Sequence, residues 1–299
     1  MHSLYNLLAN ACGVEKITAG DFITVPVDFA FVNDLYLQVI LSFNDIGDNR
    51  VWATDKIAFI MDHYAPSPTI QAASNQKKMR DFVHEQGIKH FFDVNKGVCH
   101  QVVPESGLLR PGMILIGTDS HTTTHGAYGC FSTGVGATDM AGILYTGEIW
   151  LRVPEIMRII INGIPQNNVM AKDIMLHIIS QLGTDAAIYW AIDFYGETVE
   201  WLNLDERLVL CNMAVEMGAK ATYIQPDEKV LAYFHQLGNK INDSEKNNLI
   251  DFLAYSKVSR ADFQFVREFD ISSLRPQVAL PHQVDKVVRV DKIEGKPID

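Results

Sequence analysis

Short apolar runs alternate with longer segments of helical periodicity along most of the chain. Residues 57–61 and 113–116 are apolar runs of the length of a buried strand, and polar residues follow each run closely. Residues 69–85 instead place apolar side chains about every 3.6 positions and end shortly before Gly87, as an amphipathic helix does. This alternation of strands and helices predicts an α/β fold, with mostly parallel sheets in three-layer domains.

The same patterns place the remaining elements. Helices are predicted over residues 4–11, 37–43, 69–85, 172–182, 205–217 and 227–237, and one more from Met140 with Thr138 or Asp139 as its cap. Strands are predicted over residues 23–27, 57–61, 90–94, 113–116, 158–161, 192–195 and 221–224. We expect one α/β domain over residues 1–153 and a second over 154–242. Residues 243–299 do not show this alternation of strands and helices, and we interpret them as a connector toward a further domain.

Composition narrows the class of protein. The 299 residues are 47% hydrophobic and 20% charged, which is ordinary for a globular protein of about two domains. A net charge of -11 argues against a nucleic-acid-binding surface and favours a small ligand or a protein partner. No apolar run approaches the roughly 20 residues of a membrane span, and the N-terminus lacks the basic segment of a signal peptide.

The cysteines give no sign of a local thiolate site. Cys12, Cys99, Cys130 and Cys211 lie far apart in the sequence, and no C-x-x-C pair occurs. This use of cysteine is typical of a reducing compartment, so we expect a cytoplasmic protein.

Histidines follow three successive predicted strands. His63 closes the first of them, His100 follows the second, and His121 lies in the polar stretch 117–126, which reads Gly-Thr-Asp-Ser-His-Thr-Thr-Thr-His-Gly. The carboxyl ends of parallel strands meet at one edge of a sheet, where open α/β folds bind their ligands. We therefore expect these histidines to lie in one cleft between the two domains.

Carboxylates accompany these histidines, and such pairs are the usual means of moving protons near neutral pH. Asp119 lies two residues before His121. Asp62 is adjacent to His63, so the two can pair only where the strand end is irregular, because neighbours on a strand point to opposite faces. Asn212 and Glu216 are four residues apart on a predicted helix and share one face, which we expect to point toward the histidines.

Four ordered motifs resemble the aconitase family, most closely the large subunits of 3-isopropylmalate dehydratase and homoaconitase. They are Asp62-His63 with Pro66, residues 97–101 (Gly-Val-Cys-His-Gln), residues 117–122 (Gly-Thr-Asp-Ser-His-Thr) and residues 212–219 (Asn-Met-Ala-Val-Glu-Met-Gly-Ala). The resemblance implies an aconitase-like α/β fold. It also implies a hydro-lyase that moves a hydroxyl between neighbouring carbons of a hydroxy acid, here isopropylmalate in leucine biosynthesis, with homocitrate-type or methylmalate-type substrates as alternatives.

The same resemblance implies roles for individual residues. His63 with Asp62 resembles the acid that protonates the leaving hydroxyl, and His100 resembles the histidine paired with Asp119. His121 and Glu216 resemble the pair that holds a water on the iron of a [4Fe–4S] cluster. Three further residues are expected in substrate binding: Ser120, Thr124 and Asn212.

The sequence also departs from the family. The motifs that carry the three cluster-ligating cysteines do not occur, and Cys99 and Cys130 match no ligand position. The arginines that bind substrate in this family, and its serine base, are expected from later parts of the enzyme, including a small swivelling subunit. Residues 35–38 also differ from the family's segment. We therefore expect residues 1–299 alone to bind no cluster and to turn over no isopropylmalate.

Two alternatives remain at this stage. The chain could be a mononuclear metal hydrolase that binds zinc or iron through its site histidines and Asp119, because these are suitable ligand types. It could also be a non-catalytic relative that keeps the fold and serves as a binding partner.

Overall fold

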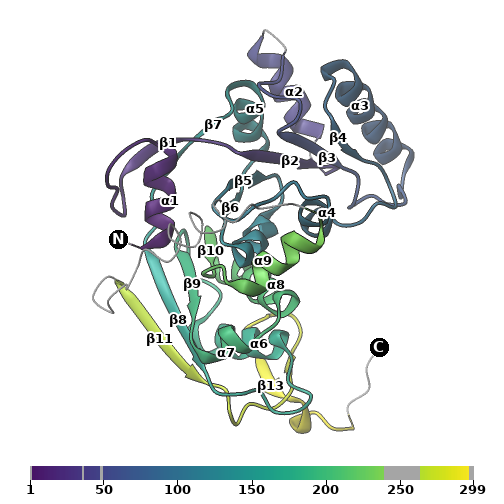
Figure 1. The fold of residues 1–299 in the computed structure, drawn as a ribbon. Coiled ribbons are helices and arrows are strands. Elements are labelled where there is room, and N and C mark those ends of the chain that lie inside the picture. The colour runs from purple at the N-terminus through teal and green to yellow at the C-terminus, as the bar shows by residue number, and fades with distance from the viewer. Residues whose placement is uncertain (1, 36, 48–49, 239–262, 296–299) are drawn as a thin grey trace.

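The computed structural model describes residues 2–35, 37–47, 50–238 and 263–295 (Figure 1). The helices are α1 (Ser3–Ala11), α2 (Leu37–Ile46), α3 (Ile70–Gln86), α4 (Cys99–Glu105), α5 (Ala137–Thr146), α6 (Ala171–Leu182), α7 (Glu197–Trp201), α8 (Leu204–Met213) and α9 (Glu228–Gln236), with 3-10 helices η1 (Ser120–Tyr128), η2 (Ala214–Met217) and η4 (Val290–Lys292). The strands are β1 (Phe22–Pro26), β2 (Phe29–Asn33), β3 (Ile57–Ile60), β4 (His90–Phe92), β5 (Ile114–Gly117), β6 (Phe131–Gly134), β7 (Glu148–Arg152), β8 (Ile156–Asn162), β9 (Ala191–Tyr195), β10 (Ala221–Tyr223), β11 (Phe265–Asp270), β12 (Gln277–Ala279) and β13 (Val287–Arg289).

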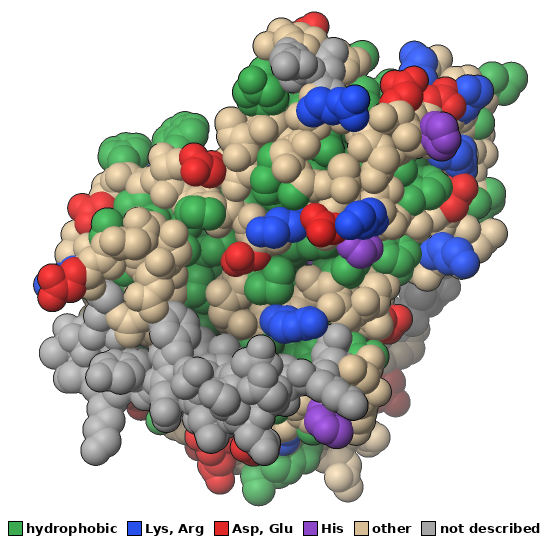
Figure 2. Space-filling view, turned by 45° about the horizontal axis from the view of Figure 1, so that its top comes forward, with side chains coloured by type: hydrophobic (Ala, Val, Ile, Leu, Met, Phe, Trp, Pro, Cys, Tyr) green, Lys and Arg blue, Asp and Glu red, His purple; other side chains and the backbone are tan. Residues whose placement is uncertain are grey.

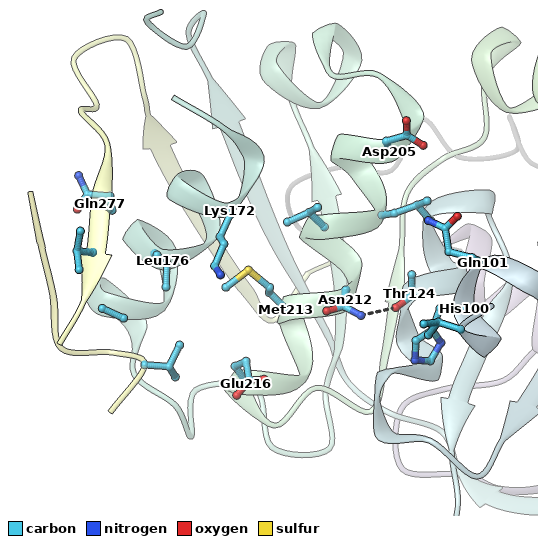
Figure 3. A pocket seen from close by; sticks show the side chains of 16 residues that line it. His100, Gln101, Thr124, Lys172, Leu176, Asp205, Asn212, Met213, Glu216 and Gln277 are labelled. Atoms are coloured by element: carbon cyan, nitrogen blue, oxygen red, sulfur yellow. Dashed lines mark hydrogen bonds between the residues drawn. The ribbon is translucent and has the colours of Figure 1, made fainter. Parts of the chain in front are cut away.

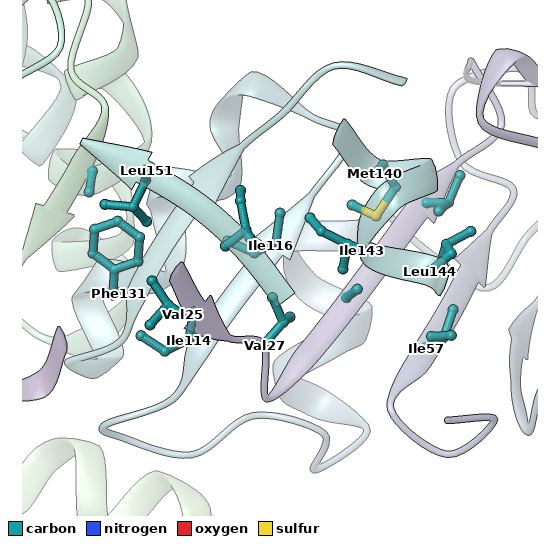
Figure 4. Packing of buried hydrophobic residues seen from close by; sticks show 14 of the residues in the cluster. Val25, Val27, Ile57, Ile114, Ile116, Phe131, Met140, Ile143, Leu144 and Leu151 are labelled. Atoms are coloured by element: carbon teal, nitrogen blue, oxygen red, sulfur yellow. The ribbon is translucent and has the colours of Figure 1, made fainter. Parts of the chain in front are cut away.

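The first parallel sheet has the strand order β4-β3-β2-β5-β6 and is buried on both faces. Successive residues of one strand enter different cores: Ile57 and Phe59 of β3 pack with α2, α3 and α5, whereas Ala58 and Ile60 pack with α4 and α9. Figure 4 shows the first of these cores, where Met140 and Leu144 of α5 lie against the sheet. Because alternate residues of the strands are apolar on both faces of the sheet, helices pack on each face and form three layers with it. The α/β prediction is confirmed.

The second parallel sheet has the order β10-β9-β8-β11 and forms the lower part of the molecule in Figure 1. Its core contains residues of β8, β9, α6 and α8. The sequence indicated no strand after residue 243, yet β11 pairs in parallel with β8 along its whole length. The hairpin of β12 and β13 also packs on α6, where the Gln277 amide donates to Asp173. Residues 243–262 of the predicted connector lie outside the described residues.

Helix ends follow side-chain and glycine chemistry. Thr69 caps α3 by accepting the amide of Ala72, and Gly87 ends the helix in the left-handed region with φ 68°. The cap predicted for the helix at Met140 is wrong, because α5 begins at Ala137 and its N-cap is Gly136, without a side-chain hydrogen bond. No helix in the described ranges is long and apolar enough to span a membrane.

The segment η1 joins the two sheets. Thr123 donates its hydroxyl to the Cys211 carbonyl at 3.1 Å, Thr222 donates to the Thr123 carbonyl at 2.7 Å, and the Ile224 amide donates to Gly126 at 3.0 Å. A Cβ on Gly126 would lie 2.2 Å from the backbone oxygen of Thr222, so only glycine permits this approach. The chain that follows β5 is therefore held rigidly against the second sheet.

Candidate active site

The carboxylate of Asp119 is the centre of the histidine cluster. It is the N-cap of η1, directly after β5. Its Oδ1 lies 3.2 Å from His100 Nε2 and 3.5 Å from His121 Nδ1, and its Oδ2 lies 3.2 Å from His63 Nε2. The three histidines come from the loop after β3, from α4 and from η1. The strand-end pattern thus predicted a cluster that the fold does assemble, and the contact of His100 with Asp119 is the one that the family resemblance implied.

Charge is unevenly distributed in this cluster. Burial by itself would raise the pKa of Asp119, but hydrogen bonds from His100 and His121 outweigh it and hold the pKa well below its usual range. The hydrogen bond to Asp119 in turn raises the pKa of His121, against the opposing effect of burial and with a further contribution from Glu216. The Asp119–His121 pair therefore favours a carboxylate beside an imidazolium.

Asp62 and His63 form the adjacent pair that the sequence permitted only at an irregular strand end. Strand β3 ends at Ile60, and His63 Nδ1 lies 2.7 Å from Asp62 Oδ1. The other oxygen of Asp62 accepts the backbone amide of Cys99 at 2.7 Å, which ties this loop to the start of α4. His63 therefore contacts a carboxylate at each ring nitrogen, as a ring with a proton to give would.

Strand β2 supplies two polar residues that the sequence analysis missed. Asn33 Nδ2 donates to Asp119 Oδ2 at 3.3 Å. Asp34 accepts the backbone amides of His63 and Tyr64 at 2.9 and 3.0 Å, and so fixes the loop that carries His63. The signal was present, since a buried apolar run followed by Asn33-Asp34 has the same form as the run before Asp62-His63.

Helix α8 and η2 form the opposite wall. Glu216 Oε1 lies 3.5 Å from His121 Nε2, the second contact expected from the sequence. Asn212 Nδ2 donates to Thr124 Oγ1 at 2.9 Å, and this hydroxyl donates to the His121 carbonyl at 2.6 Å. Ser120 Oγ lies 3.4 Å from His121 Nδ1, and its side chain is exposed. All nine residues predicted for the site thus lie in or beside the cluster.

A cavity of about 910 Å³ is lined mainly by residues of α4, α6, α8 and β12 and includes four of the predicted residues. Figure 3 shows His100, Thr124 and Asn212 at one end and Lys172 and Gln277 at the other. Its lining is Val98, His100, Gln101, Thr124, Lys172, Leu176, Asp205, Leu208, Val209, Asn212, Met213, Glu216, Gln277, Val278, Ala279 and Val284. Aliphatic side chains make up about half of this wall, so the cavity suits a small ligand with both polar and apolar parts.

Two groups of side chains have the residue types of a metal site, Cys99 with His100 and Asp119, and Asp34 with Asp62 and His63. Their acceptors already face donors within the chain. Asp119 faces three imidazoles and the His121 amide, while the oxygens of Asp34 and Asp62 accept backbone amides. Burial also raises the pKa of the Cys99 thiol. Within the part of the chain that the structure describes, the carboxylates of both groups therefore already have hydrogen-bond donors.

Comparison with known proteins identifies the family of this chain. The sequence model described as "Aconitase family (aconitate hydratase)" matches residues 23–298, which is most of the chain. The chain belongs to the aconitase family. The membership expected from the four motifs is thereby confirmed.

Several curated proteins are similar to this aconitase-family chain over nearly its whole length. A probable 3-isopropylmalate dehydratase large subunit of Methanothermobacter thermautotrophicus is 45% identical over 98% of the chain and 68% of its own length. A probable methanogen homoaconitase large subunit of the same organism is 42% identical, over 100% of the chain and 69% of its own length. The 3-isopropylmalate dehydratase large subunit 1 of Methanopyrus kandleri is 43% identical, over 98% of the chain and 68% of its own length.

Members of the aconitase family generally use a [4Fe–4S] cluster, which is bound through thiolates gathered at one point. All four cysteines of this chain are in the described part and none is in a disulfide. Cys99 and Cys130 lie in one core, Cys211 lies in another, and Cys12 follows α1. Burial raises the pKa of all three core thiols, that of Cys211 to about 12. These cysteines do not form a cluster-binding set.

Proposed function

We propose that this chain is the large-subunit part of a hydro-lyase that dehydrates and rehydrates isopropylmalate in leucine biosynthesis. The observation that carries the proposal is the carboxylate of Asp119 in contact with three imidazoles beside a cavity that is partly apolar. The resemblance to 3-isopropylmalate dehydratase large subunits supports the substrate. The words "large subunit" in those names support a small subunit as the partner.

Within this function, His63 is the general acid. Asp62 holds Nδ1 of the ring, and Nε2, now facing Asp119, is the atom that gives a proton to the leaving hydroxyl. His100 holds the other oxygen of Asp119, so the carboxylate keeps its orientation when His63 turns toward the substrate.

The remaining residues bind the substrate or a water. His121 and Glu216 provide an imidazolium and a carboxylate beside the position of the substrate hydroxyl or of a water, and the raised pKa of His121 favours its charged form. Ser120 is exposed next to His121 and would donate to a substrate carboxylate. Thr124 and Asn212 form the wall behind it.

A second candidate substrate is homocitrate or homoaconitate, because a homoaconitase large subunit is nearly as similar as the dehydratases. A methylated malate is a third. In each case the complete enzyme would use a [4Fe–4S] cluster bound by residues other than the four cysteines of this chain. We place the enzyme in the cytoplasm, which suits cysteines that form no disulfide.

Turnover by the natural enzyme, assembled with its small subunit under anaerobic conditions, tests this function. Isopropylmalate should give the unsaturated product faster than homocitrate or citramalate does. Preference for homocitrate would replace the first candidate by the second, and no dehydration of any hydroxy acid would refute the proposed function.

The acid is tested in the same preparation by His63→Ala. We expect kcat to fall by about 100-fold or more, with a much smaller change in KM, because general acid catalysis contributes that order. His84→Ala removes an exposed histidine at the end of α3 and should leave both constants unchanged. A rise in KM at unchanged kcat would assign His63 to binding instead.

A further inference from the structure

A second imidazole, that of His125, lies next to the ring of His100. His125 in η1 is completely buried, and its ring centre is 5.7 Å from that of His100. Both ring nitrogens of His125 and Nδ1 of His100 are buried without a hydrogen-bond partner among the described residues. Buried polar atoms are nearly always paired, so three such nitrogens on two neighbouring rings call for a common explanation.

Aromatic rings and a rigid backbone hold the two imidazoles together. Phe31 meets His100 and His125 edge-on, at ring-centre distances of 6.3 and 6.0 Å, and Tyr128 stacks on His125 at 6.4 Å. Gly126, the next residue, is pressed against the backbone of Thr222. His125 therefore has little room to turn toward solvent, and the neighbouring ring of His100 also has a buried nitrogen without a partner among the described residues.

The charge state of His125 decides what it can offer. Burial, and then the nearby His100, lower the pKa of His125 well below its ordinary value, whereas Asp119 has a weaker opposite effect. His125 is thus a neutral imidazole with one N–H donor and one acceptor. When His100 is a neutral imidazole with Nε2–H directed at Asp119, its Nδ1 has a lone pair that can accept a hydrogen bond.

We propose that His125 is a positioning residue, whose ring N–H donates to His100 Nδ1 and thereby keeps Nε2–H of His100 directed at Asp119. With ring centres 5.7 Å apart, two ring nitrogens that face each other lie within a few tenths of an ångström of hydrogen-bonding distance. The contact would fix both the tautomer and the orientation of His100, as hydrogen bonds from neighbouring residues do for catalytic and metal-binding histidines in other proteins. Its effect on turnover rests on the function proposed above, whereas the hydrogen bond does not.

The hydrogen bond is tested first, in the full chain with ¹⁵N-labelled histidine. An N–H···N bond between two imidazoles gives a ¹⁵N–¹⁵N coupling in the NMR spectrum, and His100 should be protonated at Nε2. His125→Phe keeps an aromatic ring of similar size and should remove the coupling, which also assigns it. A wild-type spectrum without such a coupling, or with His100 protonated at Nδ1, would overturn the proposal whether or not any variant folds.

Turnover is tested second, in the assembled enzyme. His125→Phe should lower kcat by about 10-fold or more at nearly unchanged KM, and His125→Gln, which keeps an N–H donor, should recover most of that loss. Equal kcat for the two variants would make His125 a packing residue only and contradict the positioning role. If the wild-type enzyme dehydrates none of the hydroxy acids, the proposed function fails while the coupling still decides the hydrogen bond.

Discussion

Asp119 shows how much of this site depends on one side chain. Its carboxylate contacts three imidazoles, an asparagine amide and a backbone amide, each contributed by a different part of the first sheet's edge or by η1. Because its pKa is depressed, its stabilising contribution is present above the ordinary value of 3.8 and is lost only as the pH falls through the lowered one. The carboxylate therefore stays charged at every pH above its ordinary range.

His121 leads to a stability prediction of opposite sign. Its pKa is raised, first by the hydrogen bond to Asp119, so its contribution is complete below the ordinary value of 6.5 and is lost as the pH rises through the raised value. We expect His121→Gln to unfold at a lower temperature than the wild type in mildly acid buffer. The difference in Tm should shrink as the buffer becomes alkaline. A difference that stays constant across this range would show that the charge of His121 contributes nothing.

At the scale of single elements, η1 makes the most specific prediction. Gly126→Ala should destabilise the chain by about 1–3 kcal/mol or more, because the added Cβ meets the backbone of Thr222 and neither segment can yield cheaply. The matched control is Gly142→Ala, inside α5, where a Cβ meets nothing within 4 Å. That change should stabilise by roughly 0.5–1 kcal/mol, since alanine is the better helix former. Equal denaturation midpoints for the two variants would contradict the close approach.

The elements most visible in the sequence were those with a clear period and a chemical end signal. Helix α3, with Thr69 before it and Gly87 after it, is found almost residue for residue. Strand β2 was missed, although it lies at the centre of the first sheet, because its apolar run follows another extended segment after only two residues. Strand β11 was missed because exposed residues such as Arg267 and Glu268 conceal the apolar pattern, and pairing with β8 decides its conformation.

The site was more predictable than the sheets that carry it. Three histidines after three strands predicted a cluster, since parallel strands bring their carboxyl ends together whatever the strand order. The part played by Asn33 and Asp34 could not be predicted without β2. The contact of His125 with His100 depends on side-chain directions inside a 3-10 helix, which residue spacing does not determine. The division into domains at residues 153 and 242 remains a prediction.

On the face shown in Figure 2, acidic and basic side chains are intermixed among the coloured residues, and neither sign forms a continuous surface. The net charge of -11 also means that the surface as a whole does not attract a small anionic substrate. Such a substrate would be bound by the pocket. The one lysine of the cavity lining, Lys172, is exposed at the end away from the histidines.

The cysteines lead to a prediction for residues 1–299 as a whole. Anaerobic reconstitution of this chain with iron and sulfide should yield no absorbance of a [4Fe–4S] cluster, because its three buried thiols are divided between two cores and resist ionisation. Isopropylmalate should not be converted by the same sample. A stable cluster with turnover would show that these cysteines come together in a way that their positions here do not allow.

The central claim is that the imidazoles around Asp119 move the proton of a dehydration, and one substitution tests it most directly. Asp119→Asn keeps the size of the side chain but removes the charge that the three histidines share. In the enzyme assembled with its small subunit, we predict that kcat for isopropylmalate falls by about 100-fold or more while KM changes far less. Asp81→Asn, at an exposed carboxylate paired with Lys77 on α3, is the control and should leave kcat unchanged. A kcat for Asp119→Asn equal to that of Asp81→Asn would contradict the account.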